Sequence, residues 1–169
     1  HLHCPFTEDY SAAKLFLNML NTNIISEQGT DLASPIKLAL DHIQKDENFF
    51  KVIILVSDGE DHQGRVMKLV DDAKKRGIIV HTMGVGTVMG GPIPILDVSG
   101  NRKDFKKDRS GNIVTSKLNG ATLNDIAFKT GGKYIRVENQ ANAIAPIIHE
   151  ISEMENRELK SHVFSQYED

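Results

Sequence analysis

Side chains suited to metal chemistry are concentrated at residues 57–62, in the sequence Ser-Asp-Gly-Glu-Asp-His. They follow directly on the aliphatic run Val52–Val56. A run this apolar is typical of a strand in a parallel sheet that helices cover on both faces. Ligands of such sheets bind at the carboxyl ends of the strands, which is where Asp58 would lie. The sequence therefore predicts an oxygen ligand for a hard cation, Asp58, at the rim of an α/β sheet.

The same run allows a second interpretation, a metal-dependent hydrolase that would use Asp58, Glu60, Asp61 and His62. Catalytic zinc needs about three protein ligands in a fixed geometry, with hydrogen-bonded partners that orient them. Here one contiguous run supplies the carboxylates, and His81 lies inside a predicted strand. The sequence also shows no nucleophile beside an orienting base. We therefore favour a non-catalytic binding module and keep the hydrolase as the alternative.

The elements that must position this rim alternate between helix and strand patterns. Apolar residues at helical spacing predict helices over residues 12–20, 32–43, 66–76, 122–130 and 144–154. Short apolar runs predict strands over residues 1–6, 52–56, 78–85 and 133–137. Thr30 or Asp31 is the predicted N-cap of the second helix, and Thr7 or Asp9 that of the first. The pattern predicts a doubly wound α/β fold with a mostly parallel sheet.

Residues 86–120 interrupt this alternation and predict a β-hairpin insertion. Glycines and prolines break the regular pattern first. The sequence Ser110-Gly111-Asn112 then separates the strand-like segments 104–109 and 113–118. Basic residues of this stretch alternate with Asp104 and Asp108, which favours a solvated hairpin.

Length and charge exclude several classes of protein. A chain of 169 residues fits one domain with a sizeable core. The net charge of −3 leaves no basic surplus for nucleic acid. The single cysteine, Cys4, has no internal disulfide partner and is predicted to act as a small buried hydrophobe. No stretch has the length and apolar character of a membrane span, and no signal peptide is evident.

An upstream loop adds a second candidate ligand, Thr30. The motif Gly29-Thr30-Asp31-Leu32 precedes a predicted helix, and Ser57-Asp58-Gly59 ends a strand. In this order the two motifs resemble a von Willebrand factor A (vWA) domain. The segment 4–10 (Cys-Pro-Phe-Thr-Glu-Asp-Tyr), the turn 107–112 and the sequence Arg-Glu-Leu at 157–159 are similar to the bacterial aerotolerance-operon (Bat) type. The resemblance covers nearly the whole chain.

The resemblance implies a fold, a site and a partner. It implies a Rossmann-like sheet in the order 3-2-1-4-5-6, with a metal-ion-dependent adhesion site at its rim. Thr30 and Asp58 would then be ligands of Mg²⁺, and a partner protein would donate a carboxylate to the metal. The implied role is non-catalytic protein binding in a bacterial stress or aerotolerance complex, associated with the inner membrane through flanking segments.

One departure from the family pattern sets further expectations. The family builds its site first on an Asp-x-Ser-x-Ser loop, and the sequence contains no such motif. We therefore interpret residues 1–155 as a partial vWA domain that begins inside strand 3, with 156–169 as a charged tail or linker. Mg²⁺ is expected to bind these residues only weakly, because water replaces the missing ligands. The strand at 52–56 is expected to be a sheet edge through which copies of the chain associate.

Overall fold

The computed structural model describes residues 4–20, 31–43, 50–61, 64–97, 99–137 and 143–154. At its centre is a parallel sheet of β1 (Lys51–Ser57), β2 (Ile78–Gly84) and β7 (Tyr134–Arg136), in the order β1-β2-β7. β1 pairs with β2 along its whole length, from Lys51 opposite Ile78 to Ser57 opposite Gly84. β7 pairs with the last three residues of β2. The predicted α/β class with a parallel sheet is confirmed.

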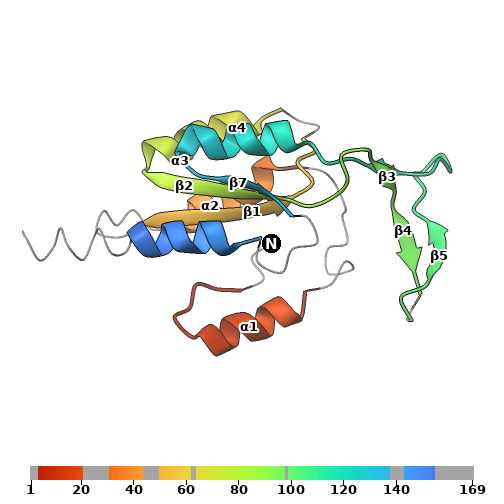
Figure 1. Cartoon of the computed structure of the whole chain (residues 1–169), viewed down its shortest axis with the longest axis horizontal. Helices are drawn as coiled ribbons and strands as arrows, with labels where there is room; N and C mark the ends of the chain where they lie inside the picture. The colour runs from red at the N-terminus through yellow and green to blue at the C-terminus, as the bar shows by residue number, and fades with distance from the viewer. Residues whose placement is uncertain are drawn as a thin grey trace, which may run out of the picture.

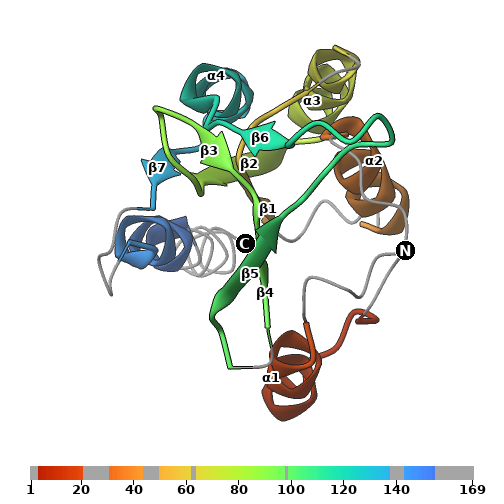
Figure 2. The ribbon, with the colours of Figure 1, turned by 90° about the vertical axis from the view of Figure 1, so that its right-hand side faces the viewer.

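Helices lie on both sides of this sheet. α2 (Ala33–His42), α3 (Val66–Lys75) and α4 (Gly120–Thr130) lie on one side, and the helix over residues 145–154 lies on the other (Figures 1 and 2). The fold is therefore doubly wound, as expected. Pro146 stands in the first turn of its helix, where no intrahelical N–H bond is lost.

The main core lies between the sheet and the three helices on its first side. Its buried residues are Leu32, Ile36, Leu40, Leu55, Val66, Val70, Ala73, Ile78, Val80, Leu118, Leu123 and Ile126. Two threonines tie α4 to β2: the Thr82 hydroxyl donates to the Leu123 carbonyl (2.8 Å), and the Thr130 hydroxyl accepts from the Val80 N–H (3.0 Å). These buried polar contacts fix the height of α4 over the sheet and with it the loop that precedes α4.

Helix starts follow the predicted signals in part: α1 (Tyr10–Asn18) agrees, whereas the N-cap position of α2 is Leu32, one residue after the predicted Asp31. Asp9 caps α1, as one of the two predicted residues. The Asp31 carboxylate accepts from the Ala33 N–H (2.9 Å) at the start of α2. α4, however, is capped by Asn119, whose side chain accepts from the Thr122 N–H (3.3 Å). Thr122 itself lies inside the helix, so the predicted start was two residues late.

The strand predicted at residues 1–6 is not supported by its described part. Residues 4–6 form no strand, and residues 1–3 lie outside the described residues. A strand needs a neighbour for its N–H and C=O groups, and Pro5 has no N–H to offer. The described part of the chain places no strand beside this segment. The predicted tail, 156–169, lies outside the described residues.

The insertion is built differently from the predicted hairpin. β3 (Gly91–Pro92) pairs with β6 (Thr115–Ser116), and β4 (Pro94–Leu96) pairs with β5 (Arg102–Phe105), both antiparallel. A single bridge, between Lys107 and Ile113, joins the two segments that were expected to pair. Residues 91–96 compete for the same backbone groups: they pair with β6 at one end and with β5 at the other, so these strands do not pair with each other. We call residues 86–118 the arm, and it projects from the carboxyl ends of the strands (Figure 1).

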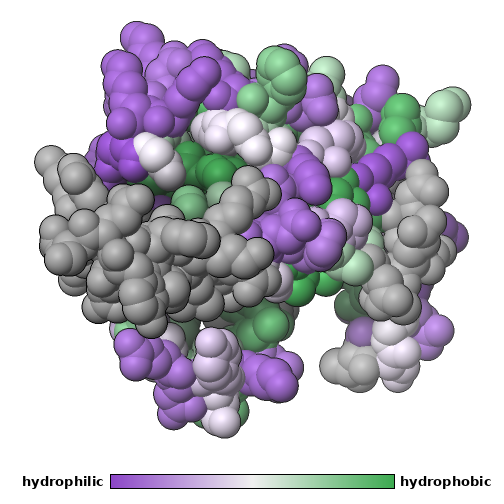
Figure 3. Space-filling view, turned by 60° about the vertical axis from the view of Figure 1, so that its left-hand side comes forward, coloured by the Kyte–Doolittle hydropathy of each residue, from purple (hydrophilic) through white to green (hydrophobic). Residues whose placement is uncertain are grey.

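β1 is covered less completely than predicted. β2 is buried on both faces, but in β1 the side chains of Ile54 and Val56 are 38% and 60% exposed. Within the described residues, β1 has a strand neighbour on one side only. α1 has no buried residue and lies apart from the sheet (Figure 2). Hydrophobic side chains therefore reach the surface of the described part, among hydrophilic ones (Figure 3).

Candidate functional site

Asp58 lies directly after the last residue of β1, at the rim where the sequence predicted it. The turn that follows depends on Gly59, which has a φ of 78° and is buried. The Gly59 N–H donates to the Ser57 hydroxyl (3.0 Å), and the Glu60 N–H donates to Asp58 Oδ1 (3.3 Å). These local bonds hold the half-buried Asp58 carboxylate close to the end of the strand.

A second segment, 116–119, fastens this loop from the other side. The Ser116 hydroxyl donates to Asp58 Oδ2 (2.9 Å). The Lys117 N–H donates to Glu60 Oε1 (3.1 Å), and the Asn119 N–H donates to the Asp58 carbonyl (2.7 Å). Sequence reasoning missed Ser116, because it stands 58 positions from Asp58 and no local pattern links them. The arm and the Asp58 loop are therefore joined at their bases.

The donor set at this rim matches a hard cation. It offers a carboxylate from Asp58 and hydroxyls from Ser57 and Ser116, all oxygen donors of the kind that Mg²⁺ prefers. Mg²⁺ keeps several waters and binds few protein ligands, so one carboxylate with two hydroxyls is the type of ligand set that it takes. The described residues contain no group of three His, Cys, Asp or Glu that could hold a metal ion, so the described part of a site here is limited to Asp58 and these hydroxyls.

The other predicted ligand, Thr30, lies outside the described residues, and its pairing with Asp58 stays a prediction. The neighbouring Asp31 is described: besides the Ala33 N–H, its carboxylate accepts from the Ser34 hydroxyl. That hydrogen bond lowers the pKa of Asp31, and the backbone N–H donors at the helix start act in the same direction. Asp31 is thus engaged with the first turn of α2, although the N-cap position itself is Leu32.

The hydrolase alternative gains no assembled site in the described part of the chain. Asp58 and Glu60 both accept hydrogen bonds from the arm. His62 lies outside the described residues. His81 is buried in β2, on the strand rather than at the rim. The absence of catalysis is still a prediction, but none of these contacts positions a nucleophile or base.

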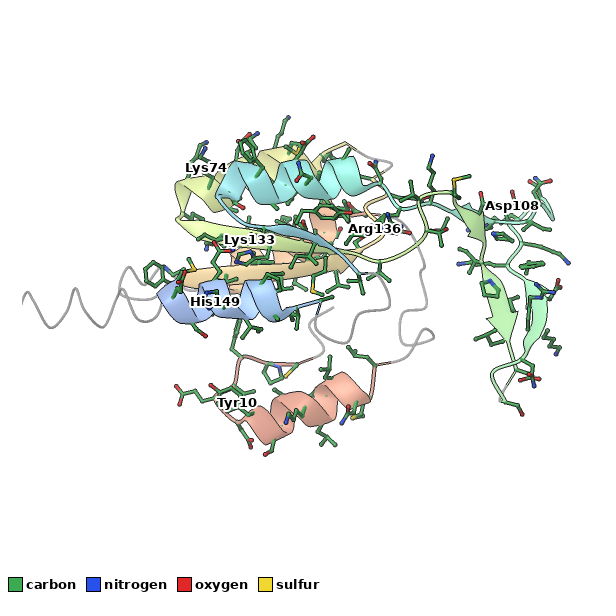
Figure 4. The ribbon with its side chains drawn as sticks, in the orientation of Figure 1. Tyr10, Lys74, Asp108, Lys133, Arg136 and His149 are labelled. Carbon is green, nitrogen blue, oxygen red and sulfur yellow. The ribbon has the colours of Figure 1, made fainter. Side chains whose placement is uncertain are left out.

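A separate polar cluster joins β2 to the helix over 145–154. The fully buried His81 accepts from the Lys133 N–H through Nδ1 (3.0 Å), which leaves its proton on Nε2; among the described residues, Nε2 has no hydrogen-bond partner. Lys133 Nζ lies 3.1 Å from Glu150 Oε2 on that helix. Figure 4 labels Lys133, which lies near this helix. Burial lowers the pKa of His81; the Glu150 carboxylate opposes this shift, and the Lys133 ammonium adds to it.

Comparison with known proteins decides the family. The sequence matches the von Willebrand factor type A domain over residues 2–150. The chain belongs to the vWA family. This match confirms the resemblance carried by the loop before α2 and by Ser57-Asp58-Gly59. Among curated proteins, none matches this vWA chain closely enough to count as a relative.

Two solved structures are similar to this vWA domain. One is the conserved hypothetical protein BatB from Bacteroides thetaiotaomicron, 36% identical, with a TM-score of 0.82. The match covers 91% of this chain and 73% of BatB. The other is an aerotolerance-related membrane protein from Bacteroides fragilis NCTC 9343, carrying multiple mutations to serines. It is 36% identical, with a TM-score of 0.77, over 88% of this chain and 72% of that one. The Bat-type resemblance is thereby confirmed.

No described helix of the vWA domain combines the length and the apolar character needed to cross a bilayer.

Proposed function

We propose that this vWA module binds a protein partner through a cation at the Asp58 rim, as part of a membrane-associated, Bat-type bacterial assembly. The observation that carries the proposal is the position of the Asp58 carboxylate. It lies at the carboxyl end of β1, half-buried, with serine hydroxyls beside it. Solved relatives named BatB and aerotolerance-related membrane protein support the cellular setting.

The proposed recognition is metal-bridged and non-catalytic. Asp58 and Thr30 would hold Mg²⁺, and waters would fill the remaining positions. When bound, the cation would supply an open position for a carboxylate of the partner. A carboxylate–cation contact at a partly desolvated rim is strong and directional, which suits reversible assembly. The residues of the chain contribute by holding the Asp58 carboxylate in place through Ser116 and the Glu60 N–H.

Titration of Mg²⁺ into the 169-residue chain, followed by amide NMR, tests the metal site. We expect binding no tighter than about millimolar, since water replaces most ligands of a full site. The shifts should centre on the amides of Gly59 and Glu60. Asp58→Ala should abolish them, whereas Asp125→Ala, which removes an exposed carboxylate on α4, should leave them unchanged.

Shifts that survive Asp58→Ala would place the cation elsewhere and contradict the proposal. A micromolar constant that depends on Asp58 would keep the site but overturn the expectation of weak binding, because it would require more protein ligands than Asp58 and Thr30.

A further inference from the structure

The arm differs in charge from the rest of the molecule. Residues 86–118 hold six of the 20 basic residues of the chain but only three of its 23 acidic residues. The chain as a whole has a net charge of −3, so the arm is a basic projection on an acidic protein. It extends beyond the sheet and is open on several sides (Figures 1 and 2).

Two of the three acidic residues of the arm are used to close turns. The turns share the pattern Asp-x-Ser-Gly-Asn, at 97–101 and at 108–112. Asp97 accepts from the N–H groups two and four positions further on, both at 2.9 Å. Asp108 accepts from the equivalent pair, both at 2.8 Å. These backbone donors keep the pKa of Asp108 below its usual value, so it stays ionised and engaged within its own turn.

The third acidic residue, Asp104, is also engaged locally. It accepts from the Phe105 N–H (2.8 Å) and pairs with Lys107 (3.1 Å). The backbone hydrogen bond, followed by the Lys107 ammonium, lowers the pKa of Asp104. The three carboxylates are exposed, but each accepts hydrogen bonds within the arm, and together they offset three of its six cations. The charge that remains toward solvent is positive.

The remaining surface of the arm combines cations with apolar side chains. Arg102, Lys103, Arg109 and Lys117 are exposed, and the Arg102 guanidinium lies 4.9 Å from the centre of the Phe105 ring. Exposed apolar side chains of the arm are Val88, Met89, Ile95, Leu96 and Ile113. Arginine, methionine and aromatic residues are enriched at protein interfaces, and the arm carries Arg102, Met89 and Phe105. A surface of this kind fits a polypeptide that has carboxylates and some apolar residues.

The base of the arm meets the candidate metal site. Ser116 and Lys117 both bond to the Asp58 loop, at Asp58 and Glu60 respectively. A partner that delivers a carboxylate to a cation at Asp58 must therefore pass beside the arm. By that requirement the partner presents at least one carboxylate, and the arm offers complementary charge along its path.

From this charge complementarity we infer that the arm is the docking surface for an acidic segment of the partner protein. Arg102, Lys103 and Arg109 receive the carboxylates of that segment, and the base of the arm directs it toward Asp58. This inference rests on the proposed function for the choice of partner. The arm itself acts without metal, so the two can be tested apart.

The test uses fluorescein-labelled poly-L-glutamate as the acidic probe and fluorescence anisotropy as the readout. We expect the 169-residue chain to bind the probe, with an affinity that falls as salt is added. The triple variant Arg102→Glu, Lys103→Glu, Arg109→Glu should bind at least about tenfold more weakly, because opposite charges are replaced by like charges at the docking surface.

A matched control carries the same change in charge away from the arm: Lys14→Glu, Lys68→Glu, Lys74→Glu, on exposed positions of α1 and α3. Its affinity should stay within about twofold of the unmodified chain, since these sites lie outside the docking surface. Circular dichroism of both variants checks that the fold is kept. Chelation of metal by EDTA should leave binding of the probe by the unmodified chain unchanged, and Asp58→Ala should remove any gain in affinity from added Mg²⁺. If no Mg²⁺ effect appears but arm binding remains, the proposed metal function fails and the arm inference stands.

Three outcomes would overturn the inference. Equal weakening by the two triple variants would mean that only overall charge matters. Failure of the unmodified chain to bind the probe would remove the docking surface. Binding to phosphatidylglycerol vesicles, but not to poly-L-glutamate, would assign the arm to a lipid surface instead of a protein.

Discussion

Replacing Gly59 with alanine should destabilise the fold by breaking the contact between the Asp58 loop and α4. Gly59 has a φ of 78°, a region in which a side chain costs about 1–2 kcal/mol. An added Cβ would also overlap the Asn119 carbonyl oxygen and lie 2.8 Å from Leu123 Cγ. Overpacking of this kind costs about 1–3 kcal/mol. The expected loss in the free energy of unfolding is therefore about 2–5 kcal/mol.

The matched control for this prediction is Gly77→Ala. Gly77 follows the C-cap of α3 with a φ of 66°, and an added Cβ would have no heavy atom within 4 Å. Gly77→Ala therefore tests only the cost of placing a side chain on a backbone with positive φ, about 1–2 kcal/mol. Urea unfolding followed by circular dichroism measures both variants. The difference between them isolates the clash with α4.

The reasoning would be refuted if Gly59→Ala lost no more stability than Gly77→Ala. Such a result would mean that the loop and the start of α4 move apart freely. In that case the bond from the Asn119 N–H to the Asp58 carbonyl would not fix the site. A large loss in the free energy of unfolding, with shifted amide signals at Glu60 and Lys117, would show that the contact between the Asp58 loop and α4 stabilises the fold and also positions the rim.

The remaining predictions concern acid stability and self-association. Burial lowers the pKa of folded His81 below the unfolded value of about 6.5, so stability should be full above that pH and fall as the pH drops toward the folded pKa. Urea unfolding between about pH 7.5 and 5.5 should show this loss, and His81→Asn should flatten it, whereas His149→Asn at an exposed position should not. The 169-residue chain should also associate through β1, and Val56→Lys should reduce the association measured by light scattering. A monomer whose Ile53 amide exchanges slowly would contradict this, because the edge would then be covered.

The sequence by itself determined the elements whose signals are local. The aliphatic run before Ser57-Asp58-Gly59 predicted β1 and placed Asp58 at its end, because a strand of this composition needs only its own residues to be recognised. The helix predicted over residues 66–76 is α3, which ends at Lys75, since charges and a glycine within one turn set a helix terminus. The order of these motifs was specific enough to indicate the vWA family, which the match over residues 2–150 confirmed.

Only the tertiary structure decided the features that depend on distant partners. Ser116 reaches Asp58 across 58 positions, and nothing in the spacing of residues signals such a contact. The strands of the arm pair mainly through residues 91–96, and a single bridge forms around the turn at 110–112, because several antiparallel partners compete for the same backbone groups. The exposure of Val56 has the same origin: an apolar run predicts a strand, but its burial depends on which neighbours the rest of the fold brings beside it.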